Sequence, residues 1–290
     1  SGKTVFATAL IVGKLAAHRQ MGLFMPDTAG DLSDPKRHDR GTFKWNWVEA
    51  LKAAAVRVDN ISIEDIRLTS PDTLESLLKE AFHGAFNTDA DHSKRLAKQV
   101  VEALFDEGKV DGARVSADNI LRAARDNIAS IYATPATRKE KENEVQAVQE
   151  NPARRSSFDR TIEHIHSFFD GREKLDDLIR DILLNGRKVV VRMDSSFLSE
   201  HEQEYVMNEM MLSLTKYARK IFKGGGMCNA LVVLDEGTRW VPEGIAHESA
   251  VGETVKTAYR ETRKYGLGWM VIAQRMTEIA LFLYDSNPLA

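Results

Sequence analysis

We predict an α/β fold, in which a large helical domain is inserted into a core with a parallel sheet, from three observations. Four short apolar runs match buried strands, and segments with helical periodicity separate the last three of them. Strands that alternate with helices in this way form parallel sheets covered on both faces. The stretch between the first and second runs is instead rich in Ala, Leu, Glu, Lys and Arg, which favour helices. We therefore expect a core of residues 1–32 and 187–290, with a mainly helical insert at 33–186.

The composition is that of a globular chain. Its 290 residues are 43% hydrophobic and carry a net charge of -3, which is enough for one large core or two smaller ones. No apolar run approaches the roughly 20 residues that cross a bilayer, so we expect no membrane partner. The low cysteine content fits a cytoplasmic location. The single cysteine, Cys228, excludes an internal disulfide and fits a packing role in a reducing compartment. The near-neutral charge neither requires nor excludes nucleic acid.

The chain starts with the last part of a phosphate-binding motif. Gly2-Lys3-Thr4 matches the end of the P-loop pattern G-x-x-x-x-G-K-[ST], although such a triplet arises by chance about once in two thousand positions. The triplet would open a helix, where unpaired N–H groups and the helix dipole bind phosphate. Because the chain begins with Ser1 rather than Met, we expect a fragment cut just inside the motif, with its strand and first glycine upstream. The apolar residues that mark this helix are Val5, Phe6, Leu10, Ile11 and Leu15.

Polar residues end each predicted strand. The strands at 22–27, 187–194 and 229–236 end in acidic residues, and the strand at 267–275 ends in Gln274-Arg275. Ligands of parallel sheets collect at the carboxyl ends of the strands. The residues that fall there are Asp27, Asp194, Asp235, Glu236 and Gln274.

Helices are predicted between the strands and throughout the insert. One spans 200–223, and another lies between Val251 and Tyr265. In the insert, segments beginning at Ser70 and Ser116 match helix starts with capping residues. The charged run at 137–157 is predicted to be a solvated connection or an exposed helix. The apolar face of the helix at 200–223 comprises Val206, Met210, Leu214, Tyr217 and Ile221.

The segment "LVVLDE" at 231–236 carries the strongest chemical signal. A P-loop ATPase needs one carboxylate at a strand tip to hold Mg²⁺ and a neighbouring one to orient and deprotonate the attacking water. Asp235 and Glu236 stand at the two positions that this chemistry requires. The alternative is a buried strand that simply ends in an acidic turn.

Together with the segment at 259–279, these residues resemble the HerA branch of the HerA/FtsK superfamily of ring-forming, DNA-translocating ATPases. In this chain, Arg263-Lys264-Tyr265-Gly266-Leu267-Gly268 runs into an apolar strand that ends in Gln274-Arg275, as in HerA-like proteins. The segments "GLFMPDTAGDLSD" and "VVVRMDSSFLSEHEQEYVMNEMM" are similar to the second and third strands of the family. The resemblance covers residues 1–32 and about 187–280, while the insert matches only in position and character.

The resemblance implies a RecA-like P-loop NTPase core that binds ATP and Mg²⁺. It assigns Ser1 and Gly2 to nucleotide binding, and Lys3 to the β- and γ-phosphates. Thr4 and Asp235 would hold Mg²⁺, Asp235 through water, and Glu236 would be the general base.

Further roles follow from the same resemblance. Gln274 would sense the γ-phosphate, although a polar strand end bonded to backbone is the alternative. Arg260 and Arg263 are candidates for an arginine finger that acts in the neighbouring subunit, with surface ion pairs as the alternative. Asp27 and Asp194 would position loops.

The chain departs from the family at two places. The family carries Ala and then His or Gln after the acidic pair, whereas this chain has Gly237-Thr238, which leaves any coupling role of that position open. Pro usually follows the Gln-Arg pair, and here Met276 stands in its place.

Two segments are candidates for DNA contact. Residues 33–47 interleave basic residues with Phe43, Trp45 and Trp47, a mixture suited to phosphate contact and base stacking. The alternative is a loop whose tryptophans pack on the insert. Residues 247–257 form a second candidate loop, with Lys256 available for phosphate. His164 and His166 have metal-like spacing but no further ligand nearby, so we expect no metal besides Mg²⁺.

The resemblance implies an ATPase that works as a homo-oligomeric ring and moves along double-stranded DNA. We expect the ring to be a hexamer. HerA-like proteins commonly act with a nuclease or another effector in DNA end processing, repair or antiviral defence, so we expect such a partner. A secretion or conjugation pump ATPase is one alternative. Another is a ring scaffold that binds nucleotide to assemble and regulate an effector without translocating.

Overall fold

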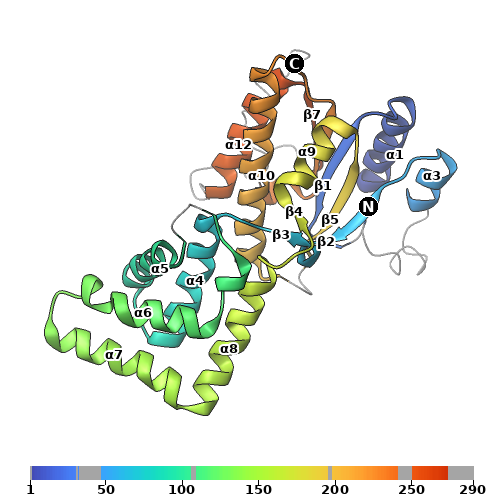
Figure 1. The fold of residues 1–290 in the computed structure, drawn as a ribbon. Coiled ribbons are helices and arrows are strands. Elements are labelled where there is room, and N and C mark those ends of the chain that lie inside the picture. The colour runs from blue at the N-terminus through green and yellow to red at the C-terminus, as the bar shows by residue number, and fades with distance from the viewer. Residues whose placement is uncertain are drawn as a thin grey trace. The chain divides into compact units, whose positions relative to one another are not determined.

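The computed structural model describes residues 2–30, 32, 47–105, 109–194, 198–240 and 250–273. The chain forms two compact units: unit 1 is Ser1–Ile63 with Leu175–Ala290, and unit 2 is Glu64–Lys174. The α/β class expected from the sequence, with a parallel sheet and a helical insert, is confirmed (Figure 1). The boundaries differ from the expected 33–186, because residues 47–63 and 175–186 lie in unit 1.

Within the described residues, unit 1 is built on five parallel strands in the order β2-β5-β1-β6-β7. The strands are β1 (Gly22–Asp27), β2 (Asp59–Ser62), β5 (Lys188–Arg192), β6 (Ala230–Leu234) and β7 (Leu267–Val271). Four of them are the apolar runs predicted from the sequence. The fifth, β2, is short and polar, and it pairs along β5 from Asp59 to Ser62.

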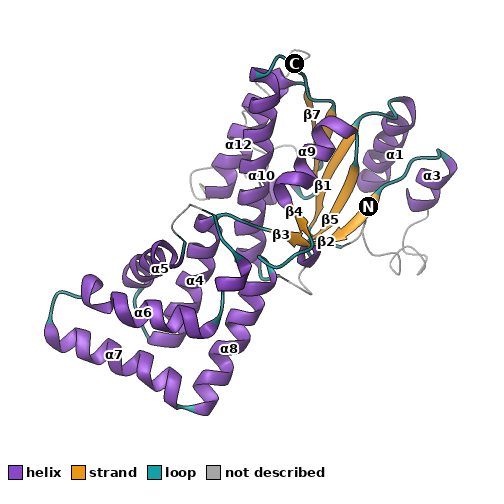
Figure 2. Cartoon of the chain, viewed as in Figure 1, coloured by secondary structure: helices purple, strands orange, loops and turns teal. Residues whose placement is uncertain are grey.

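Helices cover both faces of the sheet in unit 1 (Figures 1 and 2). One face carries α1 (Gly2–Ala17) and α3 (Trp47–Ala53), and the other carries α9 (Leu175–Asn185), α10 (Glu200–Lys223) and α12 (Ala250–Thr262). Successive strand residues point to opposite faces, so each strand contributes to both cores. The core beneath α1 and α3 includes Ile11, Leu15, Leu51, Leu23, Met25, Val190, Leu231, Val233 and Ile272.

The helices of unit 1 follow the predicted patterns. The predicted helices at 200–223 and 251–265 correspond to α10 and to α12, which is followed by a short 3-10 turn (Arg263–Tyr265). A capping box starts α10, because the Ser199 side chain accepts a hydrogen bond from the backbone N–H of Glu202, and the Glu202 carboxylate accepts one from the backbone N–H of Ser199. Of the expected apolar face of α10, Val206, Met210 and Leu214 are buried, while Tyr217 and Ile221 are half-buried.

Unit 2 is mainly helical. Two short parallel strands, β3 (Ile66–Arg67) and β4 (Glu173–Lys174), pair where the chain enters and leaves the unit. A 3-10 turn (Ile63–Asp65) precedes β3, and another (Gly112–Arg114) precedes α6. The helices of the unit are α4 (Pro71–Phe86), α5 (Ala90–Leu104), α6 (Ala117–Ile131), α7 (Pro135–Glu150) and α8 (Pro152–Ser167).

The charged run at 137–157 forms helix, which was one of the two predicted outcomes. It continues α7 to Glu150, and Asn151-Pro152 separates α7 from α8 because proline favours the first turn of a new helix. The side chain of Asn151 caps α8 by accepting hydrogen bonds from the N–H groups of Ala153 and Arg154. Ser116 caps α6 as predicted, whereas the side chain of Ser70 does not cap α4.

Among the helices that the structure describes, none combines the length and the apolar character needed to span a bilayer.

Candidate active site

Acidic residues from three neighbouring strands meet at the carboxyl edge of the sheet in unit 1. Strand β1 lies between β5 and β6, and Asp27 is its last residue. Asp194 follows β5, and Asp235-Glu236 follows β6. Because parallel strands all end at the same edge, the order of the strands brings these side chains to one place.

The first loop at this edge, after β1, is held by buried carboxylates. Asp27 is fully buried, and its Oδ2 accepts a hydrogen bond from the backbone N–H of Leu32 at 3.0 Å. Gly30 has a φ of +70°, and a Cβ at this position would lie 2.4 Å from Oδ2 of Asp194. Asp194 is itself 9% exposed and lies 3.5 Å from Nε of Arg192. Asp27 therefore holds the loop after β1, and Asp194 lies close against Gly30 of the same loop.

Proline separates the tips of β1 and β6. The pairing of these strands covers Gly22 to Phe24, whereas the pairing of β1 with β5 continues to Asp27. Pro26 has no N–H to donate to a neighbouring strand, which explains why one of the two ladders ends early. Beyond that point, a side-chain hydrogen bond from Oγ1 of Thr28 to Oε2 of Glu236, at 3.4 Å, connects the two tips.

Glu236 adopts a backbone conformation that non-glycine residues rarely adopt. Its φ is +53°, in the left-handed region, and its N–H donates to Oδ1 of Asp235 at 2.9 Å. The next residue, Gly237, donates its N–H to the carbonyl of Ile272 at 2.7 Å, which ties the turn to the segment after β7. A left-handed conformation costs a residue with a Cβ about 1–2 kcal/mol. Such strain concentrates at functional sites, and here it turns an exposed carboxylate away from the buried strand.

The N-terminus of α1 lies at the same edge. Residues 18–21 connect the end of α1 directly to the start of β1, so the helix runs antiparallel to the strand. The 16 residues of α1 rise about 24 Å and the six of β1 about 20 Å, which brings the start of the helix level with the end of the strand. Gly2 therefore begins a helix at the edge where Asp235 and Glu236 lie. The predicted helix and its start are confirmed, while Ser1 and the side chains of Lys3 and Thr4 lie outside the described residues.

The arginine-finger candidates lie at the opposite edge. Arg260 is in the last turn of α12, and Arg263 is in the turn that leads into β7. Both side chains are exposed, and the guanidinium of Arg263 lies 5.3 Å from the ring centre of Tyr259. Because β7 runs about 17 Å from this end to the carboxyl edge, neither arginine is positioned to reach Glu236 of its own chain.

Other predicted residues lie outside the described part of the chain or in a different element from the one expected. Gln274 and residues 33–46 lie outside the described part of the chain, as does the side chain of Trp47. Lys256 was expected in a loop, but it lies within α12, where its Nζ is 3.0 Å from Oε1 of Glu253. The expectation of a loop is therefore wrong for residues 250–257, because this segment has the apolar spacing of a helix.

The two adjacent carboxylates after β6 differ in exposure. Asp235 is half-buried and adjoins the turn, as a carboxylate that holds a hydrated cation would. Glu236 is exposed and lies one residue further on, where water can reach it. Sequence reasoning missed Thr28, because its contact with Glu236 depends on β1 and β6 being neighbours. Its position directly after an acidic strand end was the available signal.

Comparisons with known proteins add one structural similarity. A bacterial conjugative coupling protein, TrwBdeltaN70 in an unbound monoclinic crystal form, is similar with a TM-score of 0.39 and 10% sequence identity. The match covers 86% of this chain and 61% of that protein, so this chain spans less than two thirds of its neighbour. No protein-family model matches the chain, and no curated protein does.

Proposed function

We propose that this chain is the motor part of a ring-shaped, ATP-driven DNA translocase of HerA type, with a RecA-like P-loop NTPase core in unit 1. One observation carries the proposal: a strained Asp235-Glu236 turn and the Gly2-Lys3-Thr4 helix start lie at the same edge of a parallel sheet. Nucleotide hydrolysis needs a phosphate-binding helix start and a carboxylate pair at this relation to each other. A buried strand that merely ends in an acidic turn does not require either the strain or the helix start.

In this proposal, each residue has one task. Lys3 contacts the β- and γ-phosphates of ATP, and Thr4 and Asp235 hold Mg²⁺, with Asp235 acting through water. Glu236 accepts a proton from the attacking water, and Thr28 orients its carboxylate. Gln274 senses the γ-phosphate. Mg²⁺ held by Thr4 and Asp235 would supply positive charge against the charge that develops on the phosphates.

A ring, which we propose to be a hexamer, completes each site. Arg260 and Arg263 lie at the edge of the sheet opposite to Glu236, so an arginine finger from either of them requires a second copy of the chain. A cation supplied in this way stabilises the transition state by a factor of about 10³–10⁵ in rate. Double-stranded DNA would pass through the ring, and a nuclease or another effector would use the movement in DNA processing or antiviral defence.

The test is ATP turnover by the full-length protein with and without duplex DNA, at fixed salt, together with the mass of the assembly. The proposal expects DNA to stimulate turnover, and expects Arg263→Ala to abolish turnover without breaking the ring. Lys264→Ala is the matched control, because Lys264 is the adjacent exposed cation and has no proposed role. Turnover that ignores DNA in an intact, nucleotide-binding ring would contradict translocation and favour a scaffold. Equal losses in the two variants would remove the assignment of the finger.

A further inference from the structure

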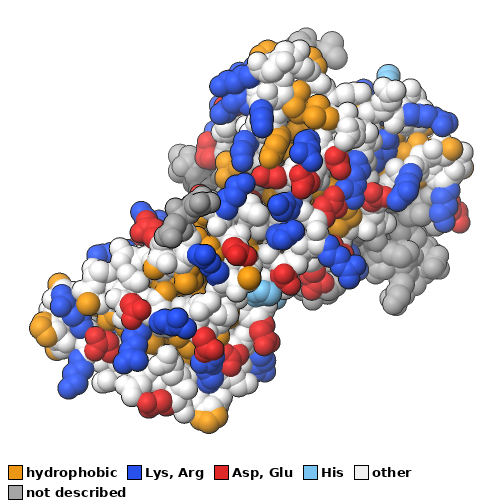
Figure 3. All heavy atoms as spheres, viewed as in Figure 1, with side chains coloured by type: hydrophobic (Ala, Val, Ile, Leu, Met, Phe, Trp, Pro, Cys, Tyr) orange, Lys and Arg blue, Asp and Glu red, His pale blue; other side chains and the backbone are white. Residues whose placement is uncertain are grey.

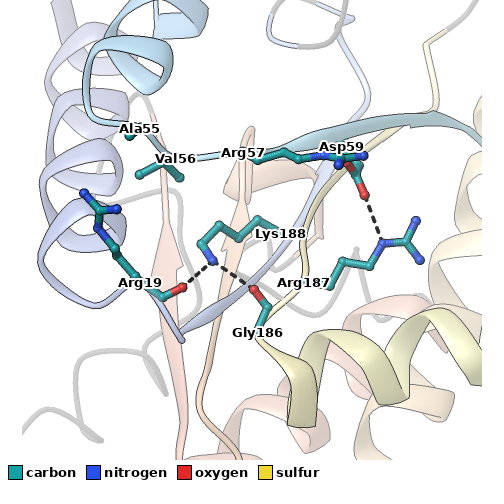
Figure 4. A pocket seen from close by; sticks show the side chains of 8 residues that line it. All are labelled: Arg19, Ala55, Val56, Arg57, Asp59, Gly186, Arg187 and Lys188. Carbon is teal, nitrogen blue, oxygen red and sulfur yellow. Dashed lines mark hydrogen bonds and ion pairs between the residues drawn. The ribbon is translucent and has the colours of Figure 1, made fainter.

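A basic groove lies at the amino edge of the sheet in unit 1, opposite to the candidate active site (Figure 4). Two adjoining cavities of about 440 Å³ and 370 Å³ share the segment Ala55–Arg57 as a common wall. The turn after α1, the segment that leads into β2 and the turn between α9 and β5 form the larger one. The charged residues that line the two cavities are Arg19, Lys52, Arg57, Arg187, Lys188 and Asp59.

The charge of this groove differs from that of the chain. The described residues that line it include five cations and one acid, whereas the whole chain has 40 basic and 43 acidic residues. On the face seen in Figure 3, basic and acidic side chains are interspersed. A concave surface lined by one sign of charge concentrates ligands of the opposite sign. The groove therefore favours an anionic ligand.

One carboxylate orients two of the arginines. Oδ1 of Asp59 accepts from Nε of Arg57 at 3.2 Å, and Oδ2 accepts from Nε of Arg187 at 3.1 Å. The carboxylate contacts both guanidinium groups and fixes the direction of both (Figure 4). The side chain of Arg57 is 91% exposed, so a ligand can reach its terminal NH₂ groups from solvent. Arginine presents such groups in a planar fork that matches the oxygens of a phosphate.

The floor of the groove is a lysine held by carbonyls. Nζ of Lys188 donates to the carbonyl of Arg19 at 2.8 Å and to the carbonyl of Gly186 at 2.9 Å. An ammonium group has three N–H donors, so one more is available for a ligand. Burial lowers the pKa of Lys188, which means that its charge is only partly compensated. Within the described residues, no carboxylate lies within ion-pair distance of Lys188 or of the guanidinium of Arg19, and an anion in the groove would supply the missing partner.

We infer that this groove binds the backbone phosphates of nucleic acid. The inference rests on the proposed function, which supplies a polymer of phosphates as a partner. Two joined cavities with spaced cations suit a row of anions better than one small anion. Among the described residues that line the two cavities none is aromatic, so the contact that they offer is with the backbone and independent of base sequence. Strand β5 has five residues and is about 17 Å long. The groove at its start therefore lies about that far from the carboxyl edge of the sheet and leaves that edge unobstructed.

The test measures binding of a fluorescent duplex DNA to the full-length protein over a range of salt concentrations, with a non-hydrolysable ATP analogue held constant. The variant is Arg19→Gln combined with Arg57→Gln, two exposed side chains whose replacement leaves the core intact. Each lost phosphate contact lowers the slope of log K against log salt by about 0.9. The double variant should therefore lose about 1.8 in slope and about sixtyfold in affinity at 0.1 M salt, equally for different sequences.

The matched control is Arg180→Gln, which removes an exposed arginine of α9 in the same unit that pairs with Asp177. Affinity and slope in the control should stay at the wild-type values. Circular dichroism and the urea midpoint of each variant verify that it is folded. The inference is overturned if the double variant binds DNA as the wild type does, or if the control loses as much.

Two competitors identify the ligand. The inference is also overturned if inorganic triphosphate or polyglutamate binds the wild type tightly through Arg19 and Arg57, while replacement of both residues leaves DNA binding unchanged. Failure of the proposed function gives a different pattern. If the groove variants weaken DNA binding but DNA never stimulates ATP turnover, translocation is contradicted, while the assignment of the groove to DNA is supported. If DNA stimulates turnover and the variants bind DNA as the wild type does, the assignment of the groove is refuted and the proposed function is not.

Discussion

Replacing Glu236 by glycine and, separately, by alanine measures the backbone strain at the proposed general base. Both changes remove the carboxylate and its hydrogen bond to Thr28, so that contribution cancels in the comparison. The left-handed conformation at φ +53° costs alanine about 1–2 kcal/mol and glycine almost nothing. Glycine loses about 0.5–1 kcal/mol more entropy on folding. We therefore expect Glu236→Gly to be more stable than Glu236→Ala by about 0.5–1 kcal/mol.

Urea denaturation followed by tryptophan fluorescence is the assay for this difference. All four tryptophans, at 45, 47, 240 and 269, belong to unit 1, so the signal reports that unit. The matched control is Lys216, an exposed position in the middle of α10, where Lys216→Gly should be less stable than Lys216→Ala by about 1 kcal/mol. If Glu236→Gly is also less stable than Glu236→Ala, the backbone at residue 236 is not strained, and its left-handed conformation is contradicted.

Three further predictions concern the site and the core. Thr28→Val should lower kcat about two- to fivefold, because Glu236 loses a hydrogen-bond partner worth about 0.5–1 kcal/mol. Thr28→Ser keeps the hydroxyl and should have the wild-type kcat. Equal kcat values for the two variants would contradict a role for the hydroxyl. Gly30→Ala should lower the free energy of unfolding by about 1–2 kcal/mol, since its φ is +70° and its Cβ would meet Asp194, and an unchanged urea midpoint would refute the close approach. Burial raises the pKa of the Cys228 thiol from 9.0 to about 11, so at pH 8 native protein should react with iodoacetamide about a hundredfold more slowly than unfolded protein. Because the folded pKa is the higher one, this thiol favours the folded state below pH 9, and that contribution should be lost between pH 9 and about 11; rapid alkylation of the native protein at pH 8 would contradict its burial.

The sequence predicted the core strands well because burial on both faces leaves a plain apolar signature. The run Ala230–Leu234 is buried at every position, and so is Gly22–Asp27. Strand β2, with the sequence Asp-Asn-Ile-Ser, was missed because it lies at the edge of the described sheet and is half-exposed. Helix α9 was placed in the insert because its amphipathic pattern shows that it packs, and does not show on which unit.

The site was predictable in its residues and not in its geometry. Acidic residues at the ends of parallel strands indicated a shared edge, and the structure brings Asp27, Asp194 and Asp235 to it. The strain at Glu236 and its contact with Thr28 depend on the order of strands in the sheet, which no local pattern encodes. The basic groove also escaped prediction, because its cations come from three distant segments that each carry an ordinary local charge.

The measurement that tests the central claim most directly compares ATP binding and ATP turnover in the full-length wild type and its Glu236→Gln variant. If Glu236 is the general base, the variant should bind Mg²⁺-ATP as tightly as the wild type while its turnover falls by about 10²–10⁴-fold. A Glu236→Gln protein that hydrolyses ATP at the wild-type rate would contradict the account, because the strained carboxylate at the sheet edge would then have no part in the chemistry.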